Sequence, residues 1–203
     1  MPKGYVDALS LPGIPKGYFT GCCGWNSTGK STLKNCLIAS AQRQGVLPVL
    51  FETESNFDFQ SIFASELSGL WAFVPLPGYE LVDEETGEEK VIDYDGNFIL
   101  FNNEAICEYC GDMDYSTMTK KSTKRKVAVV EDIAYIINDL LDKQESGELP
   151  VELLFIWDSV GSVGSWKSYT SKAGNNMFDA NSISVAFNTI VNTRIPSSRS
   201  QNY

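Results

Sequence analysis

The stretch GCCGWNSTGKST, residues 21–32, limits the possible folds of this chain more than any other part of its sequence. Residues 24–31 fit the pattern G-x-x-x-x-G-K-[ST], which requires a strand before it and a helix after it. Glycines let successive backbone N–H groups converge on phosphate oxygens, and the following helix N-terminus adds a favourable field. The pattern therefore predicts an α/β fold with a phosphate-binding loop (P-loop).

The residues of this loop have predicted roles toward ATP and Mg²⁺. Lys30 is expected to reach the β- and γ-phosphates, and Ser31 to offer its hydroxyl to the metal ion. Contacts to the nucleotide are expected from Gly24, Asn26, Ser27, Thr28, Gly29, Lys30, Ser31 and Thr32.

Apolar patterns along the chain predict strands that alternate with helices. Residues 18–23 are predicted to form the strand before the loop, residues 30–44 its helix, and residues 46–51 a second, buried strand. Further predicted elements are helices at residues 59–71, at residues 127–141 and from residue 183 to Pro196, and a buried strand at residues 151–157. This order predicts a mainly parallel sheet flanked by helices in one domain spanning residues 1–203.

Residues 78–126 do not fit this alternation and are predicted to form an inserted subdomain. Two turn signals, ETGEE and YDGN, separate segments with alternating apolar and polar residues, as in a small antiparallel β-meander. Residues 78–115 hold twelve acidic residues and one basic residue, so they carry a charge of −11 while the rest of the chain carries +1. The basic run KKSTKRK, residues 120–126, either balances this acidic block in solvent or contacts nucleic-acid phosphates.

Acidic residues follow two of the predicted strands. Asp158 is expected to anchor Mg²⁺ at the tip of a strand lying beside the P-loop strand. Glu52 and Glu54 follow the second strand on the same face, and one of them is the candidate general base that activates water. The alternatives are an acid that caps a strand end and a solvated pair of glutamates.

Five cysteines, at positions 22, 23, 36, 107 and 110, make a poor disulfide framework and favour reduced thiols. Cys107 and Cys110 have the C-x₂-C spacing of half a zinc site. Because the chain has no histidine and the other half of such a site is not evident, plain thiols in a turn are the preferred interpretation. A zinc knuckle completed by Asp112, Asp114 or a second chain is the alternative.

No apolar run approaches the roughly 18 residues that a membrane span needs. The N-terminal residues also lack an apolar segment behind a basic start. We therefore expect a soluble protein that is not exported and has no membrane partner.

Three segments together resemble the ATPase core of the RecA family of strand-exchange proteins, which includes the phage UvsX type and the RadA-type archaeal and eukaryotic recombinases. The segments are LPGIPKGYFTGCCGWNSTGKSTL, VLFETESNF and LLFIWDSVGSV, and the resemblance covers about residues 10–60 and 127–195. GIPKG, residues 13–17, matches a turn that precedes the P-loop strand in that family. Glu54 takes the place of the family's catalytic glutamate, and Asp158 with Ser159 takes the place of its Asp-Ser pair.

The resemblance implies a DNA-dependent ATPase of homologous recombination in a bacterial cytoplasm, including that of a phage-infected host. In this family ATP lies between neighbouring subunits and controls filament assembly on single-stranded DNA. Lys30 and Glu54 would then be catalytic residues. The family pattern continues with further strands beyond Pro196, so we expect this chain to be incomplete on its C-terminal side or completed by partners.

In RecA-like proteins the segment after the Asp strand faces DNA. Here this segment contains Trp166, Lys167, Tyr169 and Lys172 among glycines and serines. Aromatic side chains interleaved with basic ones suit stacking on bases and contact with phosphates. A flexible connector without a role in DNA binding is the alternative.

Three other functions are alternatives to a recombinase. A RecA-fold hexameric helicase of the DnaB kind, which also assembles as a ring, is disfavoured by the ETE strand end, residues 52–54. A small-molecule kinase is disfavoured because no Arg-rich lid appears between the P-loop and Asp158. A nucleotide-binding accessory protein that does not hydrolyse ATP, with its acidic block docked on a basic partner, stays open.

Overall fold

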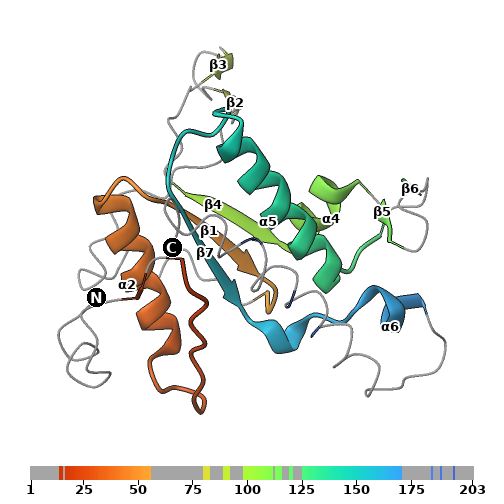
Figure 1. Ribbon diagram of the computed structural model, residues 1–203, viewed down its shortest axis with the longest axis horizontal. Helices are drawn as coiled ribbons and strands as arrows, with labels where there is room; N and C mark the ends of the chain where they lie inside the picture. Colours follow the sequence, from red (N-terminus) through yellow and green to blue (C-terminus); the bar gives the residue numbers. More distant parts are fainter. Residues whose placement is uncertain are drawn as a thin grey trace.

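The computed structural model describes residues 14–15, 17–55, 80–82, 89–91, 98–111, 113–115, 119–120 and 125–170, together with Ser184, Asn188 and Arg194. In this part of the chain a parallel three-stranded sheet lies between helices, which confirms the predicted α/β class (Figure 1). None of the helices described there is long and apolar enough to cross a membrane.

The strand β1 (Leu47–Glu52) forms the centre of this sheet. It pairs in parallel with β4 (Ile99–Asn102) on one edge and with β7 (Leu153–Asp158) on the other. All six residues of β1 are buried, because both edges are hydrogen-bonded and both faces are covered. The apolar run at residues 46–51 therefore forms a buried parallel strand, as predicted.

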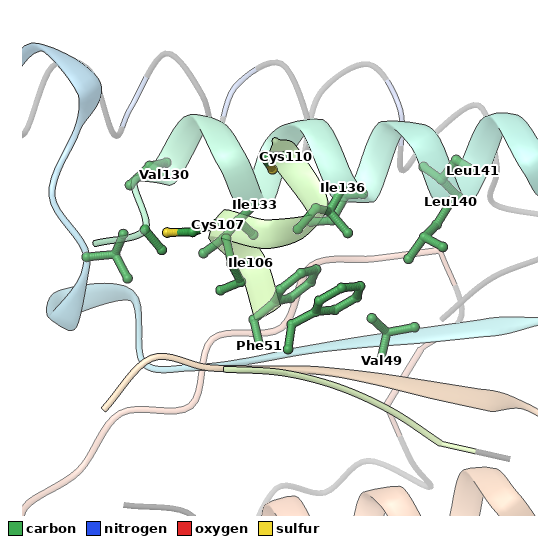
Figure 2. Packing of buried hydrophobic residues seen from close by; sticks show 14 of the residues in the cluster. Val49, Phe51, Ile106, Cys107, Cys110, Val130, Ile133, Ile136, Leu140 and Leu141 are labelled. Atoms are coloured by element: carbon green, nitrogen blue, oxygen red, sulfur yellow. The ribbon is translucent and has the colours of Figure 1, made fainter. Parts of the chain in front are cut away.

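Successive side chains of β1 point to opposite faces of the sheet and enter two separate cores. Val49 and Phe51 pack with one pair of helices, and Leu50 packs with Ile38 on the other face (Figures 1 and 2). Among the described residues, the sheet is covered by α2 (Lys30–Arg43), α4 (Asn103–Cys110) and α5 (Val130–Glu145). Leu50 and Ile38 belong to the α2 side, and the larger core belongs to α4 and α5.

The larger core joins β1 and β4 to α4 and α5 (Figure 2). The rings of Phe51 and Phe101 stack with their centroids 5.5 Å apart. Ile133 and Ile136 on α5 have no exposed surface, as expected for an apolar stripe at helical spacing. The helix predicted at residues 127–141 is therefore confirmed as α5, a covering helix of the sheet.

Local capping explains where α4 begins and ends. The side chain of Asn102 accepts a hydrogen bond of 2.8 Å from the backbone N–H of Ala105. Gly111 has φ 58°, and this left-handed conformation ends the helix. The helix lies within the segment that the sequence assigned to the inserted meander, so it was not predicted.

The inserted segment contains the first predicted hairpin, but its third predicted strand lies elsewhere. Its described residues form two short antiparallel pairs: β2 (Glu80–Val82) with β3 (Glu89–Val91), and β5 (Met113–Asp114) with β6 (Thr119–Lys120). The run FILF, expected to complete the meander, instead contributes β4 to the main sheet, because Phe101 buries its ring against Phe51. The boundaries of an insertion at residues 78–126 stay a prediction.

The prediction of a first strand at residues 18–23 is wrong for this structure. These residues have no regular secondary structure and are exposed. A strand requires a hydrogen-bonded neighbour, and no strand within the described ranges pairs with the second edge of β7. The prediction that the Asp158 strand lies beside the P-loop strand is wrong for the same reason, because residues 18–23 form no strand that could pair with β7.

The remaining predicted elements have different outcomes. The helix at residues 30–44 is confirmed as α2, and the strand at residues 151–157 is confirmed as β7. The helix predicted at residues 59–71 lies outside the described residues. Of the helix predicted from residue 183, Ser184 and Asn188 are described and are helical.

Replacement of a central core side chain should measure how strongly α5 holds the sheet. Ile133→Ala should lower the free energy of unfolding by about 2–5 kcal/mol, because it removes buried methylene groups and leaves a cavity. Val127→Ala is the control, since Val127 is 55% exposed just before the same helix. Urea unfolding followed by circular dichroism measures both variants, and equal midpoints would contradict the packing of α5 in the core.

Candidate nucleotide-binding site

Residues 24–29 form a tight loop that is closed by its own polar contacts. The hydroxyl of Thr28 donates to the carbonyl of Trp25 at 2.8 Å. A Cβ atom at Gly24 would lie 2.9 Å from that hydroxyl oxygen, which is too close for an unstrained contact. Gly29 has φ 89°, a conformation that glycine adopts without strain. Both glycines of the sequence pattern are therefore needed by the geometry of the loop.

Lys30 is the first residue of α2, and its side chain folds back over the loop. Its Nζ donates to the carbonyl oxygens of Gly24 and Trp25 at 2.9 and 2.8 Å. Residues 21–28 are exposed, and so are Ser31 and Thr32 in the first turn of the helix. The peptide dipoles of this 14-residue helix favour an anion at its N-terminus. An anion from solvent can therefore bind to the loop, the Lys30 ammonium and the N-terminus of α2.

The carboxyl ends of β1 and β7 place acidic residues at one edge of the sheet. The register sets Glu52 opposite Asp158. Glu52 is buried, and its Oε1 accepts a hydrogen bond of 3.2 Å from the backbone N–H of Glu54. Glu54 is exposed, and its carboxylate accepts a hydrogen bond from the hydroxyl of Ser159. Glu54 is thus the more accessible of the two glutamates predicted as a base.

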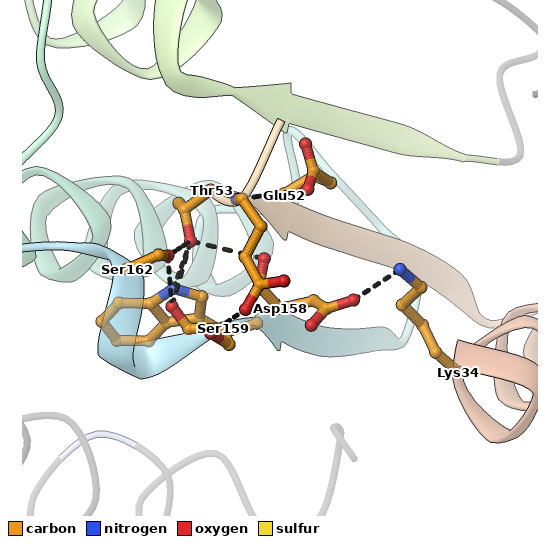
Figure 3. A network of polar contacts seen from close by, with 8 residues as sticks. Lys34, Glu52, Thr53, Asp158, Ser159 and Ser162 are labelled. Carbon is orange, nitrogen blue, oxygen red and sulfur yellow. Dashed lines mark hydrogen bonds and ion pairs between the residues drawn. The ribbon is translucent and has the colours of Figure 1, made fainter. Parts of the chain in front are cut away.

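Thr53 holds the end of β1 against the segment that follows β7 (Figure 3). Its backbone N–H donates to the carbonyl of Asp158 at 2.9 Å. Its hydroxyl oxygen lies 3.1 Å from the carbonyl oxygen of Ser159 and 2.5 Å from the hydroxyl of Ser162. Trp157 Nε1 donates to the same Thr53 oxygen at 3.2 Å. Thr53 was not predicted as a site residue, although it lies between the two predicted glutamates.

Asp158 forms an ion pair with α2 (Figure 3). The Nζ of Lys34 lies 2.6 Å from Oδ2 of Asp158, and the two side chains are 10% and 27% exposed. Lys34 follows Lys30 by four residues, so both lysines project from the same side of the helix. Lys34 was not predicted from the sequence, although this spacing was a readable signal. The peptide bond between Asp158 and Ser159 is cis.

Of the predicted Mg²⁺ ligands, Ser31 is exposed in the first turn of α2, and Asp158 is paired with Lys34. Lys34 already neutralises the Asp158 carboxylate and donates a hydrogen bond to it. Within the described ranges, no group of three or more His, Cys, Asp or Glu side chains could hold a metal ion. Mg²⁺ at Asp158 would therefore compete with Lys34 for the carboxylate, and the role of Ser31 and Asp158 toward Mg²⁺ stays a prediction.

The residues predicted to contact DNA follow β7 in a segment that is anchored to α5. This segment contains the short helices η1 (Val160–Ser162) and α6 (Trp166–Thr170). The carbonyl of Gly164 accepts a hydrogen bond of 3.0 Å from the N–H of Val130. The N–H of Trp166 donates to the carboxylate of Glu131 at 2.8 Å.

Trp166 packs against its own chain. Its ring centroid lies 5.3 Å from the guanidinium carbon of Arg125 and 5.7 Å from the ring centroid of Tyr115. Lys167 and Tyr169 are exposed. Lys172 lies outside the described residues. Within the described ranges, Lys167 and Tyr169 are therefore the accessible members of the predicted DNA-contact set.

Arg125, in the basic run at residues 120–126, is buried. It forms an ion pair with Asp132, and the two side chains are 4% and 0% exposed. The hydroxyl of Tyr115 donates to the same carboxylate at 2.6 Å. Burial and the charge of Asp132 raise the pKa of Tyr115 above its ordinary value of 10.0, so the hydroxyl keeps its proton. Arg125 therefore balances a charge inside the protein, and residues 121–124 lie outside the described residues.

Cys107 and Cys110 are core residues of α4. The Sγ of Cys110 lies 3.7 Å from the backbone oxygen of Asp132. Burial, together with the charge of Asp132, raises the pKa of Cys110 to about 12, so its thiol is neutral at physiological pH. Cys22 and Cys23, just before the loop, are exposed.

Comparison with protein-family models, curated proteins and solved structures finds no significant match for this chain. Inference about its function therefore depends on the sequence motifs and on the geometry of the site.

Alkylation should separate the exposed cysteines from the core cysteines. In the native protein, iodoacetamide should modify Cys22 and Cys23 and leave Cys107 and Cys110 unmodified until the chain is unfolded, because both core thiols are buried and the raised pKa of Cys110 keeps its thiol neutral. Peptide mass spectrometry identifies the modified sites. A zinc chelator should not change the pattern; rapid labelling of Cys107 or Cys110, with or without the chelator, would contradict the core assignment.

Proposed function

We propose that this chain is the nucleotide-binding core of a RecA-like, DNA-dependent ATPase that acts in homologous recombination. One observation carries the proposal: the Lys34–Asp158 ion pair joins the helix that follows the P-loop to the sheet edge that holds Glu54. The ion pair would thereby hold the phosphate-binding loop in a fixed position relative to Glu54, whose carboxylate could act on water. The order of the GKS, ETE and WDS motifs along the sequence supports the same function.

Binding of the triphosphate is assigned to the loop. Lys30 now donates to two neutral carbonyl oxygens, and a phosphate oxygen would be a stronger acceptor because it is charged. The N–H groups of the loop and the first turn of α2 add further donors. When ATP binds, the Lys30 ammonium would therefore leave the loop carbonyl oxygens and donate hydrogen bonds to the β- and γ-phosphates.

Glu54 is assigned as the general base. The hydroxyl of Ser159 donates to one oxygen of its carboxylate, which orients the group. A carboxylate positioned in this way can accept a proton from water, as a general base does. Glu52 is buried and accepts the N–H of Glu54, which suits a supporting role.

Single-stranded DNA and further copies of this chain are the proposed partners. Tyr169 and Lys167 offer an exposed ring and an exposed ammonium, which suit stacking on a base and contact with a phosphate. By its resemblance to RecA proteins, the chain would assemble as a filament in the cytoplasm of a bacterium, including one infected by a phage. ATP held between subunits would control this assembly.

A nucleotide-binding protein that does not hydrolyse ATP is the second candidate. It is favoured by the Lys34–Asp158 pair, because this pair occupies the carboxylate expected to anchor Mg²⁺. In that case the loop would act as a switch whose state depends on bound nucleotide.

Steady-state ATP hydrolysis with and without single-stranded DNA tests the proposal. We expect DNA to stimulate hydrolysis, and Glu54→Gln to reduce the stimulated rate by about 100-fold or more, the loss typical of a missing general base. Lys30→Ala should weaken ATP binding, since it removes the ammonium over the loop. Glu108→Gln, at an exposed glutamate of α4, is the matched control and should hydrolyse ATP like the wild type.

The other outcomes separate the candidates. A wild-type rate in Glu54→Gln would remove Glu54 from its assigned role. ATP binding without DNA-dependent turnover would favour the second candidate. Unwinding of a forked duplex would favour a helicase of the DnaB kind over a recombinase.

A further inference from the structure

The carboxylate of Asp158 has a resident cation in this structure. The ammonium of Lys34 lies 2.6 Å from Oδ2, and both side chains are mostly buried. A contact this short between opposite charges is a charge-assisted hydrogen bond, and partial exclusion of water strengthens it. A divalent cation that binds Asp158 would therefore have to compete with Lys34 for the charge of this carboxylate.

Helix packing fixes the position of Lys34, and a backbone hydrogen bond fixes that of Asp158. Leu33 and Ile38 of α2 are buried, so the helix segment that carries Lys34 is packed against the sheet. The carbonyl of Asp158 accepts the N–H of Thr53 at 2.9 Å, which fixes the backbone of the aspartate. Figure 3 shows the Lys34 side chain reaching from the helix to the end of β7. The pair is therefore built into the packing of α2 on the sheet.

On the basis of the proposed nucleotide-binding function, we propose that Lys34 determines the metal requirement of the site by replacing Mg²⁺ as the counter-ion of Asp158. With Lys34 in place, Asp158 is neutralised without a metal ion and does not repel an incoming triphosphate. Without Lys34, the partly buried carboxylate would repel ATP and would attract a divalent cation. The chain should therefore bind ATP with little dependence on Mg²⁺, and loss of Lys34 should create that dependence.

The test is the dissociation constant of ATP, measured by isothermal titration calorimetry in EDTA and in excess MgCl₂. For the wild type, Mg²⁺ should improve the dissociation constant by less than about threefold, well below the tenfold or more that one charge-assisted hydrogen bond supplies. In Lys34→Met the improvement should grow by about tenfold or more, because the uncompensated carboxylate weakens binding in EDTA and Mg²⁺ restores it. The double variant Lys34→Met with Asp158→Asn should not show this increase in the effect of Mg²⁺ on the dissociation constant of ATP.

Three further variants control for charge and for folding. Arg43→Met removes a positive charge from the last turn of the same helix and should behave like the wild type. Lys34→Arg keeps the charge and should also retain the small effect of Mg²⁺. Lys34→Gln keeps a hydrogen-bond donor for Asp158 without a charge, and it replaces Lys34→Met if circular dichroism shows that the methionine variant does not fold.

The results separate this inference from the proposed function. Equal Mg²⁺ dependence in the wild type and in the uncharged Lys34 variants, with ATP bound by all of them, would overturn the role of Lys34 and leave nucleotide binding intact. Strong Mg²⁺ dependence in the wild type that Asp158→Asn abolishes would also overturn it. Failure of every form to bind ATP, in EDTA and in Mg²⁺, would overturn the proposed function and this inference with it.

Discussion

All six residues of β1 are buried, and the rest of the described fold is arranged around that strand. Its two edges hydrogen-bond to β4 and β7, and its alternating side chains enter two cores under different helices. The parallel register with β7 then sets Glu52 level with Asp158. Since ligands of open parallel sheets bind at the carboxyl ends of the strands, the register of one buried strand determines where the chemistry can take place.

Within the described residues, two buried or partly buried ion pairs join different elements of the fold. Lys34 and Asp158 join α2 to the end of β7, and Arg125 and Asp132 join the basic run to α5. Removal of one partner from such a pair leaves a charge without compensation in a region of low dielectric. Each pair therefore favours a single arrangement of the segments it joins, and the first pair also gives the P-loop helix a fixed position at the sheet edge.

Apolar periodicity was enough to predict α2, α5, β1 and β7, because each of these elements buries a continuous run or stripe of side chains. The same signal failed for residues 18–23, where a strand-like composition has no neighbouring strand in the described structure. It also placed FILF in the wrong sheet, since alternation does not distinguish an edge strand of the main sheet from a strand of a hairpin. α4 was missed because its signal is local: the Asn102 cap and the Gly111 end.

In the candidate site, the sequence motifs predicted the loop, the two glutamates and Asp158. The residues that form hydrogen bonds and ion pairs with them were found only in the structure. The ion-pair partner of Asp158 lies 124 residues away in sequence, and the contacts of Thr53 with Ser159 and Ser162 span more than 100 residues. Trp166, predicted to contact DNA, also has ring contacts with Arg125 and Tyr115 that the local sequence did not indicate. Tertiary pairing of this kind leaves no trace in local sequence.

The proposed function requires that a nucleotide binds at the loop formed by residues 24–31. Hydrogen–deuterium exchange of the backbone amides, measured with and without saturating ATP, tests it most directly. If ATP binds there, amide exchange at the loop and in the first turn of α2 should slow, because the loop N–H groups would donate to phosphate oxygens. Exchange in α5 should not change. Unchanged exchange of the loop amides at an ATP concentration that saturates binding would show that the nucleotide does not bind at this loop.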